Sequence, residues 1–252
     1  NAALLVPLVC AVSACVTPAK FEVPQETVAA HWPAYGATPG GTHFSRARQI
    51  TPDNVHALEV AWKHRSGDAR EAGTDAQGRR VSQSSLQVTP IVVGERLYYC
   101  TPFNRVFALN AETGEELWSY DPGVDRFDSP VLPNCRGVSS WQSGASGFCE
   151  QRIFVGTQDA RLIALDAATG EPCADFGDNG QIDTSDGLAA HDPAEYGITS
   201  PPAILGDRLI TGSMVLDNQR VDAPGGVVRA YDVRTGALLW AFNPVPPGKP
   251  LR

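Results

Sequence analysis

One arginine and two hydroxyl-bearing residues in this sequence are of the types that bind an anion. Arg136 stands in Cys-Arg-Gly-Val, Thr199 in Gly-Ile-Thr-Ser-Pro-Pro, and Ser213 at the end of the run LITGS. A guanidinium binds a carboxylate through two parallel charge-assisted hydrogen bonds, and hydroxyl groups add further donors. Taken singly, each residue also fits an ordinary loop or turn, as does Ser200 beside Thr199. The elements that position these residues must decide between the two interpretations.

Asp217 and Asn218 are a second candidate pair, because a carboxylate beside an amide oxygen offers two hard-oxygen ligands. Such oxygens suit Ca²⁺ or Mg²⁺. An Asp-Asn dipeptide is also a common turn, and that interpretation stays open. No Cys-x-x-Cys or Cys/His spacing in the sequence suggests zinc.

Three similar segments supply the elements that would position these residues. They are residues 105–122 (RVFALNAETGEELWSYDP), 161–180 (RLIALDAATGEPCADFGDNG) and 228–245 (VRAYDVRTGALLWAFNPV). Each opens with residues that alternate between two faces, which indicates a strand. Asn or Asp then caps a turn, and Gly takes the positive φ that a tight hairpin requires. The sequence therefore predicts a β-hairpin in each copy.

A large aromatic residue follows the hairpin glycine by four positions in the first and third copies. These residues are Trp118 and Trp240, whereas the middle copy has Ala174. We expect each Trp to dock the hairpin against a neighbouring unit. In the middle copy this docking contact is expected to be missing or supplied by other residues.

Further strand-like runs precede the hairpins, at residues 89–102, 152–159 and 200–213. Each unit then has about four short strands and cannot bury its faces alone. Radially packed units of this size predict an all-β chain folded as a β-propeller, with about three blades present. A β-sandwich with similar turns is the alternative, and three Thr-Gly hairpins in matching context disfavour it.

Composition and missing motifs exclude several classes of function. The 252 residues are 42% hydrophobic, which allows a substantial core, and carry a net charge of −8. Without a basic stripe, we expect no nucleic-acid partner. The sequence has neither a nucleotide-binding glycine motif nor the G-x-S-x-G elbow of serine hydrolases. Because a propeller generally needs at least four blades to close, we expect an N-terminal fragment of a longer protein.

The first 15 residues form an apolar run that resembles the remnant of a secretory signal. The run is short for a bilayer span, and VSAC at 12–15 resembles a bacterial lipobox in which Cys15 would be lipidated. A cleaved signal peptide or the end of a membrane helix is the alternative. We divide the chain into this remnant (1–15), an N-terminal segment (16–60) and a partial propeller (61–252). We expect a periplasmic, membrane-anchored protein.

Export would place the remaining cysteines in an oxidising compartment, where they form disulfides. These cysteines are Cys100, Cys135, Cys149 and Cys173. Four cysteines allow three pairings. We expect Cys135 to pair with Cys149 across the short loop between them.

Several segments, taken in order, resemble the pyrroloquinoline quinone (PQQ) dehydrogenases. The most specific are NCRGVSSW at 134–141 and YGITSPPAILGDRLITGSMVLDN at 196–218, and the resemblance runs over about residues 31–248. The similarity is strongest to the membrane-associated glucose and quinate/shikimate dehydrogenases. It implies an eight-bladed propeller enzyme that oxidises a sugar or cyclic polyol and passes electrons to ubiquinone. The alternative is a non-catalytic lipoprotein propeller scaffold of the outer-membrane assembly type, which shares the Thr-Gly-Trp repeat but needs no Cys-Arg-Gly-Val.

The same resemblance implies roles for the candidate residues. PQQ is a planar tricarboxylate with an ortho-quinone, so its site needs cations, hydroxyl donors and a divalent metal. Relatives often have a carboxylate where this chain has Gln87, so the charge at that position differs. The residues implied to contact PQQ are Gln87, Arg136, Thr199 and Ser213, and those implied to bind Ca²⁺ or Mg²⁺ are Asp217 and Asn218.

Two differences from the family pattern, and one residue outside this sequence, affect the expected reaction. Leu132 stands where the glucose branch has a histidine near the cofactor, so glucose and quinate/shikimate both remain candidate substrates. No Cys-Cys pair is present, which sets aside the alcohol-oxidising branch. The family's catalytic base is an Asp from a later blade, expected beyond residue 252. We therefore name no catalytic residue and expect the fragment alone to be inactive.

Overall fold

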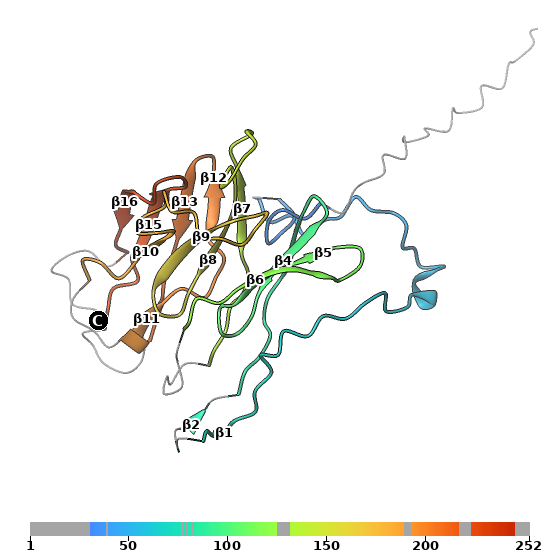
Figure 1. Ribbon diagram of the computed structural model, residues 1–252, viewed down its shortest axis with the longest axis horizontal. Coiled ribbons are helices and arrows are strands. Elements are labelled where there is room, and N and C mark those ends of the chain that lie inside the picture. The colour runs from blue at the N-terminus through green and yellow to red at the C-terminus, as the bar shows by residue number, and fades with distance from the viewer. Residues whose placement is uncertain are drawn as a thin grey trace, which may run out of the picture.

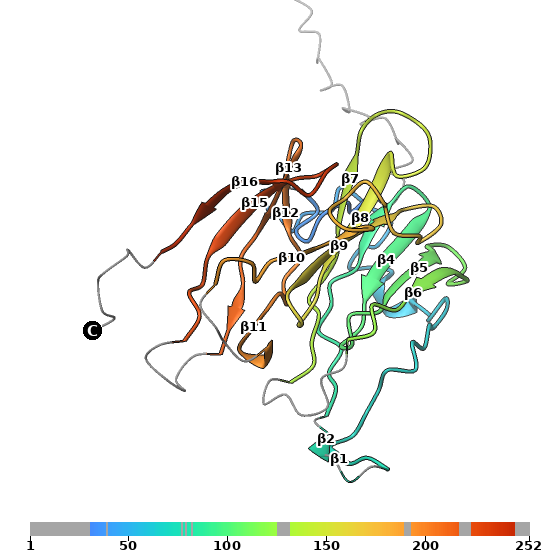
Figure 2. The ribbon, with the colours of Figure 1, turned by 60° about the vertical axis from the view of Figure 1, so that its left-hand side comes forward.

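The computed structural model of the chain describes residues 31–38, 40–76, 78, 80–81, 83–124, 132–188, 193–216 and 223–244. These residues form three four-stranded antiparallel sheets, which fan out side by side in chain order (Figure 1, Figure 2). The prediction of an all-β propeller with about three blades is confirmed. The signal remnant and Cys15 lie outside the described residues.

Helix is confined to two single 3-10 turns in the described part of the chain. These are η1 (Val55–Ala57) and η2 (Pro193–Glu195). No helix among the described residues is long and apolar enough to cross a lipid bilayer.

The first blade forms where the first repeat predicts it. Its strands, in order across the sheet, are β3 (Ile91–Val93), β4 (Arg96–Cys100), β5 (Val106–Asn110) and β6 (Glu116–Tyr120). Asn110 Oδ1 accepts hydrogen bonds from the backbone N–H groups of Glu112 and Thr113, both at 2.9 Å. Gly114 then takes a φ of 74°. The predicted cap and positive-φ glycine therefore both shape this hairpin.

Aspartates cap the corresponding turns of the other two repeats. Asp232 Oδ1 accepts hydrogen bonds from the backbone N–H groups of Arg234 at 3.0 Å and Thr235 at 2.8 Å. Partial burial acts to raise the pKa of Asp232. The hydrogen bonds from Thr235 and Arg234 outweigh this effect and hold the pKa below its usual value.

The second blade departs from the predicted hairpin. Its strands are β7 (Ser139–Gln142), β8 (Gln151–Gly156), β9 (Arg161–Asp166) and β10 (Gln181–Asp183). The fourth strand was expected directly after Gly170, but β10 follows only after a ten-residue excursion, so that prediction is wrong. After the turn, Pro172 forms an isolated bridge with Leu165, and the Cys173 N–H donates to the Ala164 carbonyl at 2.9 Å. The chain therefore stays beside β9 for a few residues without forming a regular strand. The structure also places β7 in a segment that the sequence analysis treated as a loop.

The third blade follows the repeat pattern again. Its strands are β12 (Ala203–Leu205), β13 (Arg208–Thr211), β15 (Val228–Asp232) and β16 (Leu238–Phe242). Two short sheets complete the described structure: β1 (Gly73–Thr74) with β2 (Arg80–Val81), and β11 (Tyr196–Gly197) with β14 (Met214–Val215).

The hydrophobic core lies between the blades. At its edge, tryptophan rings pack on the glycines of the hairpin turns. Trp118 of the first blade packs on Gly170 of the second, where an added Cβ would lie 2.5 Å from the indole Cε3. Trp62, in the extended segment before the first blade, packs on Gly114 in the same way, with 2.5 Å from the added Cβ to its Cδ2. In both contacts the absence of a side chain lets the ring lie against the backbone. The prediction that Trp118 docks on a neighbouring unit is confirmed.

Other residues supply the docking contact in the middle copy, as the sequence analysis allowed. An added Cβ on Gly236 of the third blade would lie 2.9 Å from Ile182 Cγ2 and 3.4 Å from Phe176 Cε2. Phe176 is fully buried and its ring packs on Phe154, with 5.6 Å between centroids. One aliphatic side chain, Ile182, and one aromatic side chain, Phe176, thus replace the missing tryptophan.

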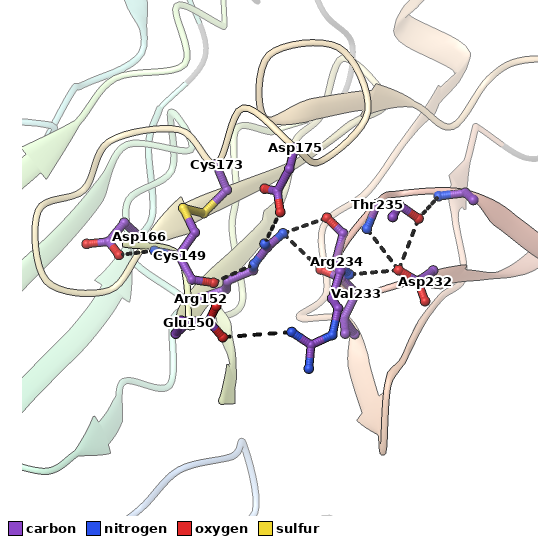
Figure 3. A network of polar contacts seen from close by, with 11 residues as sticks. Cys149, Glu150, Arg152, Asp166, Cys173, Asp175, Asp232, Val233, Arg234 and Thr235 are labelled. Atoms are coloured by element: carbon purple, nitrogen blue, oxygen red, sulfur yellow. Dashed lines mark hydrogen bonds and ion pairs between the residues drawn. A yellow bond between two sulfur atoms is a disulfide. The ribbon is translucent and has the colours of Figure 1, made fainter. Parts of the chain in front are cut away.

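Arg152 adds a polar connection between the second and third blades (Figure 3). Its guanidinium donates to the backbone oxygens of Val233 at 3.3 Å and Arg234 at 2.7 Å, and to Asp175 Oδ2 at 2.5 Å. Its Nε also donates to the Cys149 carbonyl at 2.8 Å. The side chain is only 3% exposed, so these bonds compensate a buried charge.

The disulfides are Cys100–Cys135 and Cys149–Cys173, so the expected Cys135–Cys149 pairing is wrong. Strand β7 begins after Cys135 and ends before Cys149, which carries the two cysteines away from each other. Cys135 instead meets Cys100 at the end of β4, with 6.0 Å between the Cα atoms. The first disulfide ties the first blade to the segment that carries Arg136.

Candidate functional site

The candidate site begins with the contact between Arg136 and Thr199. Arg136 donates from its backbone N–H to the Thr199 carbonyl at 2.9 Å, and from Nη1 to Thr199 Oγ1 at 2.5 Å. The Arg136 carbonyl accepts a hydrogen bond from the N–H of Thr89 at 3.1 Å. The segments that lead into all three blades therefore meet at Arg136.

A glycine allows these segments to approach closely. An added Cβ on Gly137 would lie 3.2 Å from Pro201 Cγ and 3.4 Å from the Thr89 carbonyl oxygen. Both distances are at or below ordinary van der Waals separation, so a side chain here would push the segments apart. The Cys-Arg-Gly-Val segment thus packs directly against the Thr-Ser-Pro-Pro segment.

Arg136, Thr199 and Ser213 line one hollow with a volume of about 330 Å³. We call it the anion hollow; its other walls come from residues 200–201 and from 211, 212 and 214. No carboxylate lines it among the described residues, so the guanidinium gives it a positive potential. The structure therefore brings together three of the four residues predicted to bind PQQ.

Ser213 shows that the anion hollow suits a ligand with hydrogen-bond acceptors. Its hydroxyl oxygen is buried and has no hydrogen-bond partner among the described residues. Buried polar atoms are rarely left unpaired, because desolvation without a bond costs free energy. A guanidinium, a threonine hydroxyl and this unpaired serine hydroxyl fit the carboxylates of PQQ in type and charge.

The remaining predicted site residues lie elsewhere or outside the described residues. Gln87 is exposed and does not line the anion hollow. Leu132 is also exposed, and its carbonyl accepts a hydrogen bond from Gln158 Nε2 at 3.1 Å. The predicted metal ligands Asp217 and Asn218 lie outside the described residues. Their roles, and that of Gln87, stay predictions.

Thr211, Gly212 and Met214 also line the anion hollow and were not predicted from the sequence. The cause is a long-range pairing: β11 pairs with β14 through Gly197 opposite Met214, which sets the segment after Gly197 beside the segment before Met214. Nothing local marks that pairing. The period of two along β13 places Thr211 on the same face as the buried Leu209, but does not show which end of the strand holds a ligand.

Comparison with known proteins identifies a family and several relatives that resemble this chain. Residues 32–251 match the family described as "PQQ: Glucose/ethanol/alcohol dehydrogenase, beta-propeller domain". Quinate/shikimate dehydrogenase (quinone) of Acinetobacter baylyi is 38% identical over 245 residues, covering 91% of this chain and 29% of the relative. Quinoprotein glucose dehydrogenase of Escherichia coli is 38% identical over 239 residues, covering 92% of this chain and 29% of the relative.

The fold similarity agrees with the sequence similarity. The crystal structure of quinohemoprotein alcohol dehydrogenase from Comamonas testosteroni superposes with a TM-score of 0.67 at 29% identity. The match covers 88% of this chain and 28% of that one. The chain thus spans less than a third of the length of the relatives that it matches.

Proposed function

The chain belongs to the β-propeller family of PQQ-dependent glucose, ethanol and alcohol dehydrogenases, and from that premise we propose that it is part of an enzyme that oxidises a sugar or cyclic polyol. The proposed electron acceptor is ubiquinone. The observation that carries the proposal is the meeting of Arg136, Thr199 and Ser213 around one hollow, in which no carboxylate of the described residues takes part. A propeller that serves only as a scaffold has no need for such a cluster.

In this proposal the chain binds and orients the cofactor rather than performing the redox chemistry. Arg136 would hold one carboxylate of the cofactor, and the hydroxyl groups of Thr199 and Ser213 would donate hydrogen bonds to it. When bound, PQQ supplies the ortho-quinone that takes up the two electrons removed from the substrate alcohol. The existing Arg136–Thr199 bond keeps the guanidinium in place before the cofactor arrives, which lowers the entropy lost on binding.

The metal site belongs to the same proposal. Asp217 and Asn218 follow Ser213, which lines the anion hollow, by four and five positions in the sequence. Their oxygens suit Ca²⁺ or Mg²⁺, which would polarise the bound quinone. Asp217 is the stronger of the two candidates because it brings a negative charge.

The substrate is proposed as glucose or as quinate/shikimate. The relatives named for these two activities are equally identical to this chain, at 38%. Leu132 offers an apolar side chain where the glucose branch is expected to have a histidine, which favours a substrate other than glucose. The periplasmic location fits the two disulfides, which persist in oxidising compartments. Anchoring through Cys15 stays part of the proposal.

The test measures PQQ binding by the full-length protein. The quenching of tryptophan fluorescence reports the binding. We expect saturable binding, and we expect Arg136→Met to weaken it about 10- to 100-fold because a charge-assisted bond is lost. Arg136→Lys should recover part of the affinity, since it restores the charge without the planar fork. Arg208→Met, at an exposed arginine of the third blade, is the matched control.

Dye reduction with glucose or quinate, in the presence of PQQ and Ca²⁺ or Mg²⁺, then identifies the substrate. Activity with quinate and not glucose would agree with the substitution at Leu132. A full-length protein that neither binds PQQ nor reduces the dye contradicts the proposal and supports the scaffold alternative.

A further inference from the structure

The Cys100–Cys135 disulfide adjoins the anion hollow without lining it. Cys135 directly precedes Arg136, whose side chain lines the hollow. Cys100 is the last residue of β4, in the first blade. The disulfide therefore connects the arginine of the proposed cofactor site, through one peptide unit, to a strand of the first blade.

Both cysteines are enclosed in the core between the first and second blades. Cys100 is 0% exposed and Cys135 is 2% exposed. They belong to one hydrophobic cluster with Tyr98 of β4 and with Ile153 and Val155 of β8. Thiol–disulfide exchange requires direct contact between the reacting sulfur atoms, and no oxidant reaches these sulfur atoms in the folded protein. The bond must therefore form before the two blades pack together.

Two buried polar atoms without hydrogen-bond partners flank the disulfide. Thr101 follows Cys100 in the sequence and Asn134 precedes Cys135. Neither Thr101 Oγ1 nor Asn134 Oδ1 has a partner among the described residues. Because an unpaired buried polar atom raises the free energy, another interaction must hold this arrangement in place. The covalent bond between the two adjacent cysteines provides that interaction.

Hydrogen bonds also attach the segment that carries Arg136. The Thr89 N–H donates to the Arg136 carbonyl at 3.1 Å, and the Arg136 N–H donates to the Thr199 carbonyl at 2.9 Å. Gln158 Nε2 donates to the Leu132 carbonyl at 3.1 Å. Each such bond adds little net stability, because water can replace either partner. Opening the disulfide would therefore let the segment move and bring its unpaired polar atoms to new partners.

We propose that the Cys100–Cys135 disulfide positions Arg136, and that the protein acquires high affinity for PQQ only after this bond has formed. This inference rests on the proposed function. The disulfide fixes the backbone beside Arg136, so the guanidinium already contacts Thr199 and lines the anion hollow when the cofactor arrives. Without the disulfide, PQQ binding must also order this segment, and the affinity falls.

Formation of the bond is an oxidation whose electrons leave by thiol–disulfide exchange. The thiols of Cys100 and Cys135 lose two protons and two electrons as the S–S bond forms. A protein disulfide or oxidised glutathione takes them up and becomes two thiols. Such oxidants are present in the oxidising compartment that the proposed function assigns to this protein. A chain kept in a reducing compartment would fold with a weaker cofactor site, which confines the activity to the exported protein.

The second disulfide is the matched control. Cys149–Cys173 lies within the second blade, with its two cysteines on either side of β8 and β9 in the sequence (Figure 3). Neither cysteine lines the anion hollow, and both are buried. The sequence separations are similar, 35 residues for Cys100–Cys135 and 24 for Cys149–Cys173. Removing either crosslink should therefore cost similar stability through chain entropy, so a difference in PQQ affinity reports the position of the bond.

The test measures the PQQ affinity of two double variants of the full-length protein by fluorescence titration. Cys100→Ala/Cys135→Ala should bind PQQ about tenfold more weakly than the wild type. Cys149→Ala/Cys173→Ala should stay within about twofold of the wild type. The titrations are made at a temperature at which melting curves show both variants to be folded. Equal PQQ affinities of the two variants overturn the inference.

Arg136→Met tests whether the disulfide acts through the arginine. In this background, removal of Cys100–Cys135 should change the PQQ affinity less than about twofold, because the side chain that the disulfide positions is gone. A loss of about tenfold in the same background would show that the disulfide supports the site independently of Arg136. That result overturns the assigned positioning role.

A measurement on the wild-type sequence applies if the cysteine variants do not fold. The full-length protein is unfolded, reduced and refolded with or without oxidised glutathione. Alkylation and mass spectrometry then give the oxidised fraction of each disulfide. High-affinity PQQ binding should follow the fraction of Cys100–Cys135 formed, and not that of Cys149–Cys173; binding independent of Cys100–Cys135 overturns the inference. Fully oxidised wild-type protein that binds no PQQ contradicts the proposed function instead.

Discussion

The indole of Trp118 lies against Gly170 of the following blade, so closely that a Cβ on the glycine would be 2.5 Å from the ring. The indole Nε1 also donates to the Ala167 carbonyl at 3.2 Å in the same turn. One glycine therefore satisfies two requirements at once: it allows the positive φ of the turn and leaves room for the ring. Substitutions can separate these two requirements.

Gly170→Ala should destabilise the protein more than Gly187→Ala. Both glycines have a φ of 76°, but nothing lies within 4 Å of an added Cβ at Gly187. The control should lose about 1–2 kcal/mol for the left-handed conformation alone. Gly170→Ala should lose about 1–3 kcal/mol more, because the indole must move. Urea denaturation measures both values, and equal losses would show that the Trp118 contact adds nothing.

Ser213→Ala should separate ligand binding from stability. Because the Ser213 hydroxyl is buried without a partner among the described residues, its removal should leave the free energy of unfolding unchanged or slightly higher. PQQ affinity should fall about five- to tenfold, measured by fluorescence titration.

Thr184 provides the contrasting case for that experiment. Its hydroxyl is buried and donates to the Ala160 carbonyl at 2.7 Å, away from the anion hollow. Thr184→Val should cost about 1 kcal/mol of stability and leave PQQ affinity unchanged. If Ser213→Ala behaves like Thr184→Val, the serine is a structural residue and not a ligand.

Arg152→Met should weaken the junction between the second and third blades. The substitution leaves the carbonyls of Cys149, Val233 and Arg234 without their buried donor, at a cost of about 3 kcal/mol. Arg234→Met is the control, because that side chain is 44% exposed and its pair with Glu150 is long, at 3.8 Å. The control should lose less than about 1 kcal/mol. Thermal unfolding of both variants checks the difference, and similar melting temperatures would contradict the assignment.

Acidification should remove a stabilising contribution from Asp232. Hydrogen bonds hold its folded-state pKa below the ordinary value, which for an unfolded aspartate is about 3.9. A depressed folded pKa means that the contribution is present above the unfolded pKa and is lost as the pH falls through the folded pKa. Asp232→Asn keeps an acceptor oxygen but does not titrate. Its stability should therefore fall less steeply than that of the wild type below about pH 4. Parallel curves from urea denaturation at several pH values would count against this contribution.

Local chemistry explains which parts of the fold could be predicted. The Asn or Asp cap and the following Thr-Gly act within five residues, so the hairpin at Asn110 could be predicted from sequence alone. The pairing of Cys135 could not, because it depends on how far β7 carries the chain before Cys149. The same is true of the segment after Gly170, where only an isolated bridge to β9 forms before β10 begins at Gln181.

The candidate site shows the same division. Arg136 and Thr199 are 63 positions apart, and the family resemblance was needed to select them among ordinary loop residues. Thr211 and Gly212 reach the anion hollow only through the pairing of β11 with β14, which no local pattern marks. The return of the N-terminal segment to β3, through the bridge of Trp32 with Val92, is again a tertiary event.

The two blade junctions should respond differently to temperature. Opening the contact of Trp118 on Gly170 exposes aromatic surface, which raises the heat capacity and makes the contact weaker on cooling. Opening the hydrogen bonds of Arg152 exposes polar groups, which lowers the heat capacity and partly offsets the contribution of Phe176 and Ile182. Cooling should therefore weaken the Trp118 contact more than it weakens the hydrogen bonds of Arg152.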